Sequence, residues 1–174
     1  EEEKHDYTLV VQSHIKLNQF IFLKGSTGTN IDTIARQPMW QALMDYKSGT
    51  GHSIGYVLGV HEGPARIRKE LSDVTLKPNM VLTNEPGVYK EGRYGIRIEN
   101  TMVVNEFAEN DMGSFYNFDV ISFCPIDTRP ILTTMLDASD IEWLNAYHTK
   151  VYQLLSPHLD ASTKDWLKTA TKTI

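Results

Sequence analysis

Helical periodicity at both ends of this 174-residue chain, with a strand-like pattern between them, constrains its fold more than any other feature. Apolar residues recur every 3.6 residues over about 6–23, and again in a second segment that Asn30 can cap. The segment 46–60 is rich in Gly and β-branched residues, while 81–83 and 96–98 alternate like half-buried strands. Two helical segments thus precede a middle section that is mostly sheet.

The C-terminal third returns to the helical pattern after further strand-like sequence. We expect a strand or two within 119–132, a helix that begins at Ser139 and ends before Pro157, and a last amphipathic segment as far as Ala170. Cys124, the single cysteine, is expected to be a small buried apolar residue. No internal repeat or Gly/Ser-rich linker divides the chain, so a single domain is expected over residues 1–174.

Charge and apolar content exclude several classes of function. The chain has 17 Lys and Arg residues against 22 Asp and Glu residues, a net charge of −5, and no basic block that could follow a phosphate backbone. Its longest apolar run, 20–23, is far shorter than a membrane helix needs. One cysteine excludes a disulfide framework and fits a reducing compartment. We therefore expect a soluble cytoplasmic protein that binds neither nucleic acid nor membrane.

A glycine-flanked histidine is the first feature that could carry chemistry. His52 follows the sequence Gly-Thr-Gly, whose missing side chains let a ligand or another backbone approach closely. His61 comes nine residues later, a separation that puts two side chains on opposite faces of a regular strand. A shared site therefore requires a bend, for which Gly55 and Gly59 are candidates. Since buried histidines are more often structural than catalytic, the pair alone leaves both roles open.

Two glutamates form a second candidate cluster. Residues 90–93 read as a turn, and a hairpin centred on Gly92 makes Glu85 and Glu99 cross-strand partners, because each lies seven residues from that glycine. Two facing carboxylates repel each other and need a shared proton or a cation between them. A slipped register would instead leave both glutamates solvated, and the spacing alone does not decide between these arrangements.

One histidine and two glutamates are a nitrogen and oxygen donor set suited to Mn²⁺, Zn²⁺, Co²⁺ or Fe²⁺. Such a set indicates metal-assisted hydrolysis rather than redox chemistry. Arg97 lies on the strand face opposite Ile98, where it can orient Glu99 without itself binding the metal.

Four motifs follow one another along the chain, at residues 49–55 (GTGHSIG), 60–64 (VHEGP), 82–89 (LTNEPGVY) and 95–100 (GIRIEN). In their order and spacing they closely resemble the catalytic domain of aminopeptidase P, the Xaa-Pro aminopeptidases with the pita-bread, or creatinase-like, fold. The resemblance implies part of this α+β fold, with helices packed on a curved, mostly antiparallel sheet. The resemblance also covers the opening helix, 34–36 with Trp40, and the tail 140–148. This tail resembles the long members of the family and differs from methionine aminopeptidase and the short prolidases.

The resemblance implies hydrolysis of the peptide bond before proline, with release of the N-terminal amino acid from peptides that carry proline in second position. By this resemblance His52, Glu85 and Glu99 are metal ligands, and Glu99 bridges two divalent ions. The ions implied are Mn²⁺ above all, with Zn²⁺ or Co²⁺ as alternatives. His61 would contact the substrate carbonyl and stabilise the oxyanion, and Glu85 would transfer the proton.

The chain departs from the family at two places. Two aspartates of the family's five metal ligands have no counterpart, since Asp6, Asp32 and Asp45 do not lie in the aspartate motif. Ser48 stands where the long members usually have another active-site histidine. Three ligands leave much of a two-ion site open, so weak metal binding is expected for the chain alone.

We therefore expect the chain to be the C-terminal part of a catalytic domain, with the long-form extension over about 119–174, inactive without the N-terminal part of the same protein. A non-catalytic pita-bread module that serves binding or assembly is the alternative. The resemblance also implies a homodimer formed through the C-terminal part.

Overall fold

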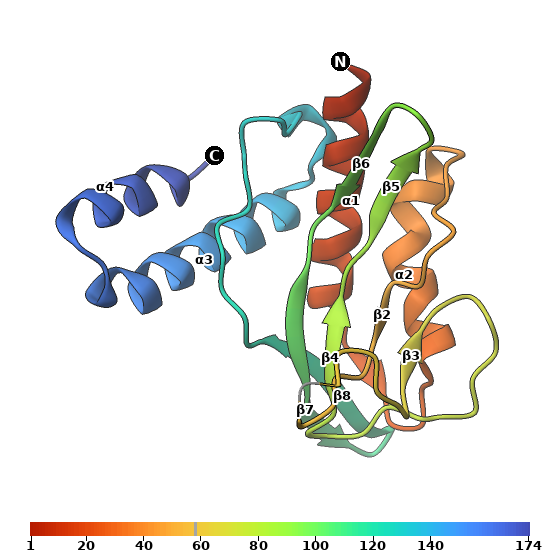
Figure 1. Cartoon of the computed structure of the whole chain (residues 1–174). Helices are drawn as coiled ribbons and strands as arrows, with labels where there is room; N and C mark the ends of the chain where they lie inside the picture. Colours follow the sequence, from red (N-terminus) through yellow and green to blue (C-terminus); the bar gives the residue numbers. More distant parts are fainter. Residues whose placement is uncertain (58) are drawn as a thin grey trace. The chain divides into compact units, whose positions relative to one another are not determined.

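Four α-helices, two 3-10 helices and eight strands make up the computed structural model, which describes residues 1–57 and 59–174 (Figure 1). The described residues form two compact units, Leu9–Ser122 and the combination of Glu1–Thr8 with Phe123–Ile174. In chain order the elements are α1 (Glu2–Asn18), β1 (Phe22–Leu23), α2 (Gly28–Gln41), β2 (Gly51–His52), β3 (Arg66–Ile67), β4 (Val81–Asn84), β5 (Gly87–Lys90), β6 (Tyr94–Arg97), β7 (Asn100–Asn110), β8 (Gly113–Val120), η1 (Thr133–Met135), α3 (Ala138–Leu155), η2 (Ser156–His158) and α4 (Ala161–Ala170). Among these residues no helix is both long and apolar enough to span a bilayer.

The two N-terminal helices lie close to their predicted positions but have different ends. Helix α1 ends before the predicted residue 23, because Phe22 pairs with Tyr116 of β8 and so belongs to a strand. The cap of helix α2 is Thr27, three residues before the cap expected at Asn30, and the side-chain oxygen of Asn30 accepts the main-chain N–H of Thr27 at 2.9 Å. Asn30 therefore caps the helix from inside its first turn. Pro38 lies within α2, which continues to Gln41.

The larger unit contains one four-stranded antiparallel sheet with the strand order β1-β8-β7-β4. The two longest strands of this sheet, β7 and β8, lie within residues 100–120, and most of this region was not predicted as sheet. Alternate residues there, such as Val104 and Phe118, are buried, whereas their neighbours, such as Asn105 and Asn117, are more exposed. No strand forms beyond Val120 in the described residues 121–132, so the strand expected over 119–132 is wrong for most of its length.

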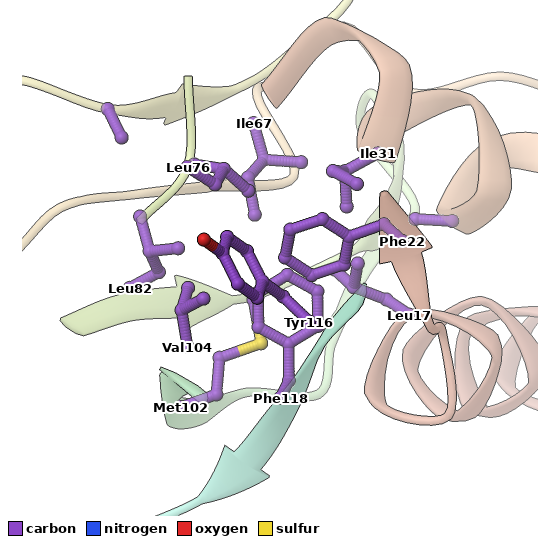
Figure 2. Packing of buried hydrophobic residues seen from close by; sticks show 12 residues of the cluster. Leu17, Phe22, Ile31, Ile67, Leu76, Leu82, Met102, Val104, Tyr116 and Phe118 are labelled. Carbon is purple, nitrogen blue, oxygen red and sulfur yellow. The ribbon is translucent and has the colours of Figure 1, made fainter. Parts of the chain in front are cut away.

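The core of this unit lies between the sheet and the helices α1 and α2. Figure 2 shows Leu17, Ile31 and Ile67 from the helices and β3 facing Met102, Val104 and Phe118 from the sheet. Phe22 lies at the centre, with its ring 5.0 Å from the ring of Phe118 and 6.0 Å, edge to face, from the ring of Tyr116. Aromatic contacts of this kind explain why a strand of two residues interrupts the helical pattern.

The smaller unit contains α3 and α4. Helix α3 begins one residue before the predicted Ser139, because Asp137 accepts the main-chain N–H of Asp140 at 2.9 Å and caps the helix. Within α3, Trp143 stacks on Tyr147, with ring centroids 5.1 Å apart.

The prediction that Cys124 is buried is wrong, because its side chain is exposed. The main chain at this residue is nevertheless held in place. The Tyr147 hydroxyl donates to the carbonyl of Cys124 at 2.8 Å and accepts its N–H at 3.2 Å.

Candidate active site

One cavity of about 530 Å³ in the larger unit brings together most of the predicted site residues. Its walls come from β2 and the residues before it, from the segment 61–68 that includes β3, from Glu85 between β4 and β5, and from the end of β6. The lining residues are Ser48, Gly49, Gly51, His52, His61, Glu62, Gly63, Ala65, Arg66, Arg68, Glu85 and Arg97. Basic and acidic side chains therefore meet in one cavity, which is the usual environment of hydrolytic chemistry.

His52 is positioned by the close approach of β2 to β4. A Cβ atom at position 51 would collide with the carbonyl oxygen of Thr83, so only glycine allows this packing. The main-chain N–H of His52 donates to the Thr83 hydroxyl at 3.0 Å. The neighbouring main chain is also tied down, because the N–H of Glu85 donates to the Thr50 carbonyl at 2.7 Å. Gly51 and Thr83 thus bring the imidazole next to the carboxylate of Glu85.

The imidazole of His52 has one nitrogen directed at each of two acceptors. Nδ1 lies 2.9 Å from the carbonyl oxygen of Ser53, which can only accept, so Nδ1 carries a hydrogen. Nε2 lies 2.9 Å from Oε1 of Glu85. Two atoms with lone pairs at this separation require a positive centre between or beside them, either a proton or a cation. With its hydrogen on Nδ1, the imidazole of His52 has a lone pair on Nε2, which is the atom that can bind a metal ion. His52 and Glu85 are therefore suited to bind a metal ion together.

His61 reaches the same place because the chain turns back after β2. The N–H of Gly55 donates to the carbonyl of Gly59 at 2.6 Å, which confirms the predicted bend at these two glycines. The rings of His52 and His61 are 4.3 Å apart at their centroids. The odd separation along the sequence is therefore compatible with one shared site.

The predicted hairpin centred on Gly92 is confirmed by two strand pairings. Gly87 pairs with Arg97 in β5·β6, and Asn84 pairs with Asn100 in β4·β7, so every pair stays equidistant from Gly92. Glu85 and Glu99 occupy the gap between these two ladders, in matching positions on the two strands. The slipped register that would separate them does not occur.

The environments of the two glutamates differ. Glu85 is buried, and its Oε1 accepts a hydrogen bond from the Thr83 hydroxyl at 2.8 Å. Glu99 is exposed in part, and its pKa is raised by partial burial and then by the nearby Glu85 carboxylate, while Arg97, His52 and His61 act in the opposite direction. Glu99 thus interacts electrostatically with the four predicted site residues that line the cavity, namely His52, His61, Glu85 and Arg97.

We expected Arg97 to orient Glu99, but in the structure it contacts Glu85. Its guanidinium lies 3.2 Å from Oε2 of Glu85 and donates from Nε to the Tyr89 hydroxyl at 2.7 Å. Thr83 and Tyr89 are thus functional neighbours that the sequence analysis missed. Thr83 could have been found from its position two residues before Glu85, on the same face of β4.

The donors fit part of a metal site. His52, Glu85 and Glu99 provide the imidazole and carboxylate ligands that Mn²⁺ and Zn²⁺ accept. Among the described residues, however, no group of three or more His, Cys, Asp or Glu side chains is arranged to hold an ion. The chain therefore carries two donors that meet in the cavity, His52 and Glu85, and Glu99 interacts with them electrostatically. These residues do not form a complete metal site.

The aspartates that we left out of the site take another role in the larger unit. Asp32 and Asp45 both bind the guanidinium of Arg36, at 2.6 and 2.7 Å. Arg36 also donates to the carbonyl of Ser48 at 2.8 Å. Neither aspartate lines the cavity, whereas Ser48, which stands at the position of a family histidine, does.

Comparison with known proteins identifies the family. The model of metallopeptidase family M24 matches residues 1–106, and a model of the C-terminal region of the same peptidases matches residues 114–174. The chain is 41% identical to aminopeptidase P1 of Lotus japonicus over 99% of its own length, and 43% identical to a probable Xaa-Pro aminopeptidase P of Fusarium vanettenii over 98%. It spans 27% and 29% of the lengths of these two relatives.

Solved structures agree with these relatives. The X-prolyl aminopeptidase of Caenorhabditis elegans, described as a cytosolic enzyme with a di-nuclear active site, superimposes with a TM-score of 0.91 at 36% identity, over 100% of this chain and 29% of that one. A Xaa-Pro dipeptidase from Bacillus anthracis matches 69% of this chain and 30% of its own, with a TM-score of 0.55 at 29% identity. The predicted pita-bread α+β fold and the resemblance to aminopeptidase P are thus confirmed. The chain belongs to metallopeptidase family M24.

Proposed function

We propose that this chain carries His52, Glu85 and Glu99 as metal ligands of an Xaa-Pro aminopeptidase that acts on peptides with proline in second position. The main support is the meeting of His52, His61 and Glu85 in one cavity, with Glu99 coupled to Glu85. The names of the relatives support the choice of substrate, since they are Xaa-Pro aminopeptidases. Because the chain spans less than a third of these relatives, the remaining ligands would come from another segment of the protein.

Each residue would have a distinct part in the reaction. Divalent ions, Mn²⁺ above all, would supply Lewis acidity toward the scissile carbonyl and activate water. Glu85, which is buried and hydrogen-bonded to Thr83, would accept the proton of that water and pass it to the leaving proline nitrogen. His61, whose ring lies against His52 on the cavity wall, would donate a hydrogen bond to the oxyanion. Arg97 would orient the Glu85 carboxylate.

The test is the variant Glu99→Gln in the complete protein, with Glu91→Gln at the exposed tip of the hairpin as the matched control. Release of the N-terminal amino acid from an Xaa-Pro peptide should fall by roughly a hundredfold or more in the first variant, because the group expected to bridge the ions loses its charge. The control should keep the parent rate. A Glu99→Gln protein with normal metal content and near-normal turnover would refute the assignment and favour a non-catalytic binding module.

We further propose that the segment from about residue 119 to 174 is the long-form C-terminal extension of the catalytic domain. The boundary of the smaller unit at Phe123 supports this division, as does the match of 114–174 to the C-terminal region of the family. A homodimer through this region, and a cytoplasmic location like that described for the Caenorhabditis elegans enzyme, belong to the same proposal.

A further inference from the structure

Helix α1 carries none of the expected ligands, yet one of its residues contacts both strands that hold the glutamates. His14 is fully buried (0% exposed), and its Nε2 lies 2.8 Å from Oδ1 of Asn100. The amide oxygen can only accept, so Nε2 donates. The carbonyl of His14 accepts from the Asn84 amide at 3.0 Å. The main-chain groups of Asn84 and Ile98 also lie close enough to the imidazole to act on it electrostatically.

The residues that His14 contacts are direct chain neighbours of the two glutamates. Asn84 immediately precedes Glu85, and Ile98 immediately precedes Glu99. Asn100 immediately follows Glu99. A displacement of His14 would therefore also displace the main chain on either side of the two glutamates.

The ladders form no pair at the two glutamates themselves. Asn84 and Asn100 form the last pair of the β4·β7 ladder, and Gly87 and Arg97 form the nearest pair of β5·β6. Along these four strands, as the structure describes them, the two glutamates lie between the ladders. Pro86, next to Glu85, has no N–H to contribute to a ladder.

His14, Asn84 and Asn100 form a buried cluster next to the two glutamates. Asn84 and Asn100 are 0% and 3% exposed. The Asn100 amide donates to the carbonyl of Ser122 at 2.9 Å, which determines which of its side-chain atoms faces His14. The hydrogen bonds within this buried cluster restrict the positions of its members, whereas two facing carboxylates tend to separate.

We propose that His14, Asn84 and Asn100 are positioning residues that set the separation of the Glu85 and Glu99 carboxylates, so that helix α1 tunes the affinity of a metal site to which it gives no ligand. This inference rests on the proposed function. It predicts that metal affinity responds to a side chain that the metal does not touch.

The experiment compares His14→Leu and His14→Gln in the complete enzyme, by calorimetric titration with Mn²⁺ and by urea unfolding. Leucine removes the donor to Asn100, whereas the glutamine amide can replace Nε2. Mn²⁺ affinity should fall about 10- to 100-fold in His14→Leu and recover in His14→Gln. Asn18→Leu removes another buried amide from the same helix and should leave the affinity unchanged.

Parent affinity in a folded His14→Leu protein would overturn the inference, and so would an equal loss of affinity in Asn18→Leu. If His14→Leu does not fold, Asn100→Ser replaces it and is judged by the same titration. Failure of the proposed function looks different, because Glu99→Gln would then bind Mn²⁺ like the parent enzyme.

Discussion

At the scale of single residues, Arg36 organises the segment that leads to His52. It is 1% exposed, and its guanidinium donates to Asp32, to Asp45 and to two carbonyls. The guanidinium also lies 3.8 Å from the centroid of the Tyr46 ring. The hydroxyl of Tyr46 meets the hydroxyl of Thr50 at 2.6 Å, two residues before the histidine. A charge buried in this way is satisfied only while all of its partners are present.

We expect Arg36→Met to lower the free energy of unfolding by about 3–5 kcal/mol, because it leaves the carboxylate of Asp32 buried without its cation. Lys69→Met is the control, since Lys69 pairs with the exposed side of Asp45 and its loss should cost less than about 1 kcal/mol. Urea unfolding of both variants measures the difference. Equal costs would mean that Arg36 contributes no more than a surface ion pair.

His61→Ala tests the role of a second residue. The ring lies beside His52 without any expected ligand function, so turnover of an Xaa-Pro peptide should fall by roughly a hundredfold while metal occupancy stays at the parent level. Metal analysis of the same preparation separates the two effects. Loss of metal in this variant would assign His61 to the ligand set.

At the scale of elements, the strands carry the site residues, and helix α1 contacts the asparagines next to the two glutamates. The helix is bonded to the sheet through His14, whose pKa is lowered by burial to about 4, against the opposing effect of its hydrogen bond to Asn100 and of the nearby main-chain groups. A histidine that stays neutral inside the protein makes stability depend on pH.

Between pH 6.5 and about 4 the unfolded chain takes up a proton at His14 that the folded chain does not. The free energy of unfolding should therefore be highest above pH 6.5 and should fall by about 3 kcal/mol as the pH drops through this window. Urea unfolding of the parent and of His14→Gln as a function of pH isolates this contribution from other groups. The same slope in both proteins would show that another group is responsible.

The sequence predicted the parts of the fold that depend on local pattern. The hairpin centred on Gly92 follows from a turn and two alternating arms, and the structure has that register. The break after Asn18 and the contact between His14 and Asn100 depend on partners far along the chain, for which no local signal exists. Thr83 could be predicted only in part. Its spacing from Glu85 is visible in the sequence, but the close approach of β2 to β4, which brings His52 to the Thr83 hydroxyl, is not.

At the scale of the whole molecule, the two units differ in what they join. The smaller unit unites both ends of the chain, since the Tyr7 hydroxyl donates to the carbonyl of Asp127 at 2.7 Å and the N–H of Leu132 donates to the Thr8 hydroxyl at 2.9 Å. The larger unit holds all the predicted site residues. It therefore holds only part of the two-ion site that we propose.

Calorimetric titration of the 174-residue chain with Mn²⁺ should therefore give weak binding that does not saturate where the complete enzyme does, because three donors leave coordination positions open. His52→Ala should abolish what remains. Two tight sites on the chain alone would mean that the missing ligands come from its own residues or from a second copy.

The common register of the two ladders on either side of Glu85 and Glu99 has a consequence for how such proteins diverge. Residues added at the tip, beyond Lys90 and Tyr94, lengthen the hairpin without moving either carboxylate. A single residue inserted within one arm turns every later side chain of that arm to the opposite face. Homologous proteins should therefore vary the length of the hairpin freely while keeping the distance from each glutamate to the neighbouring asparagine constant.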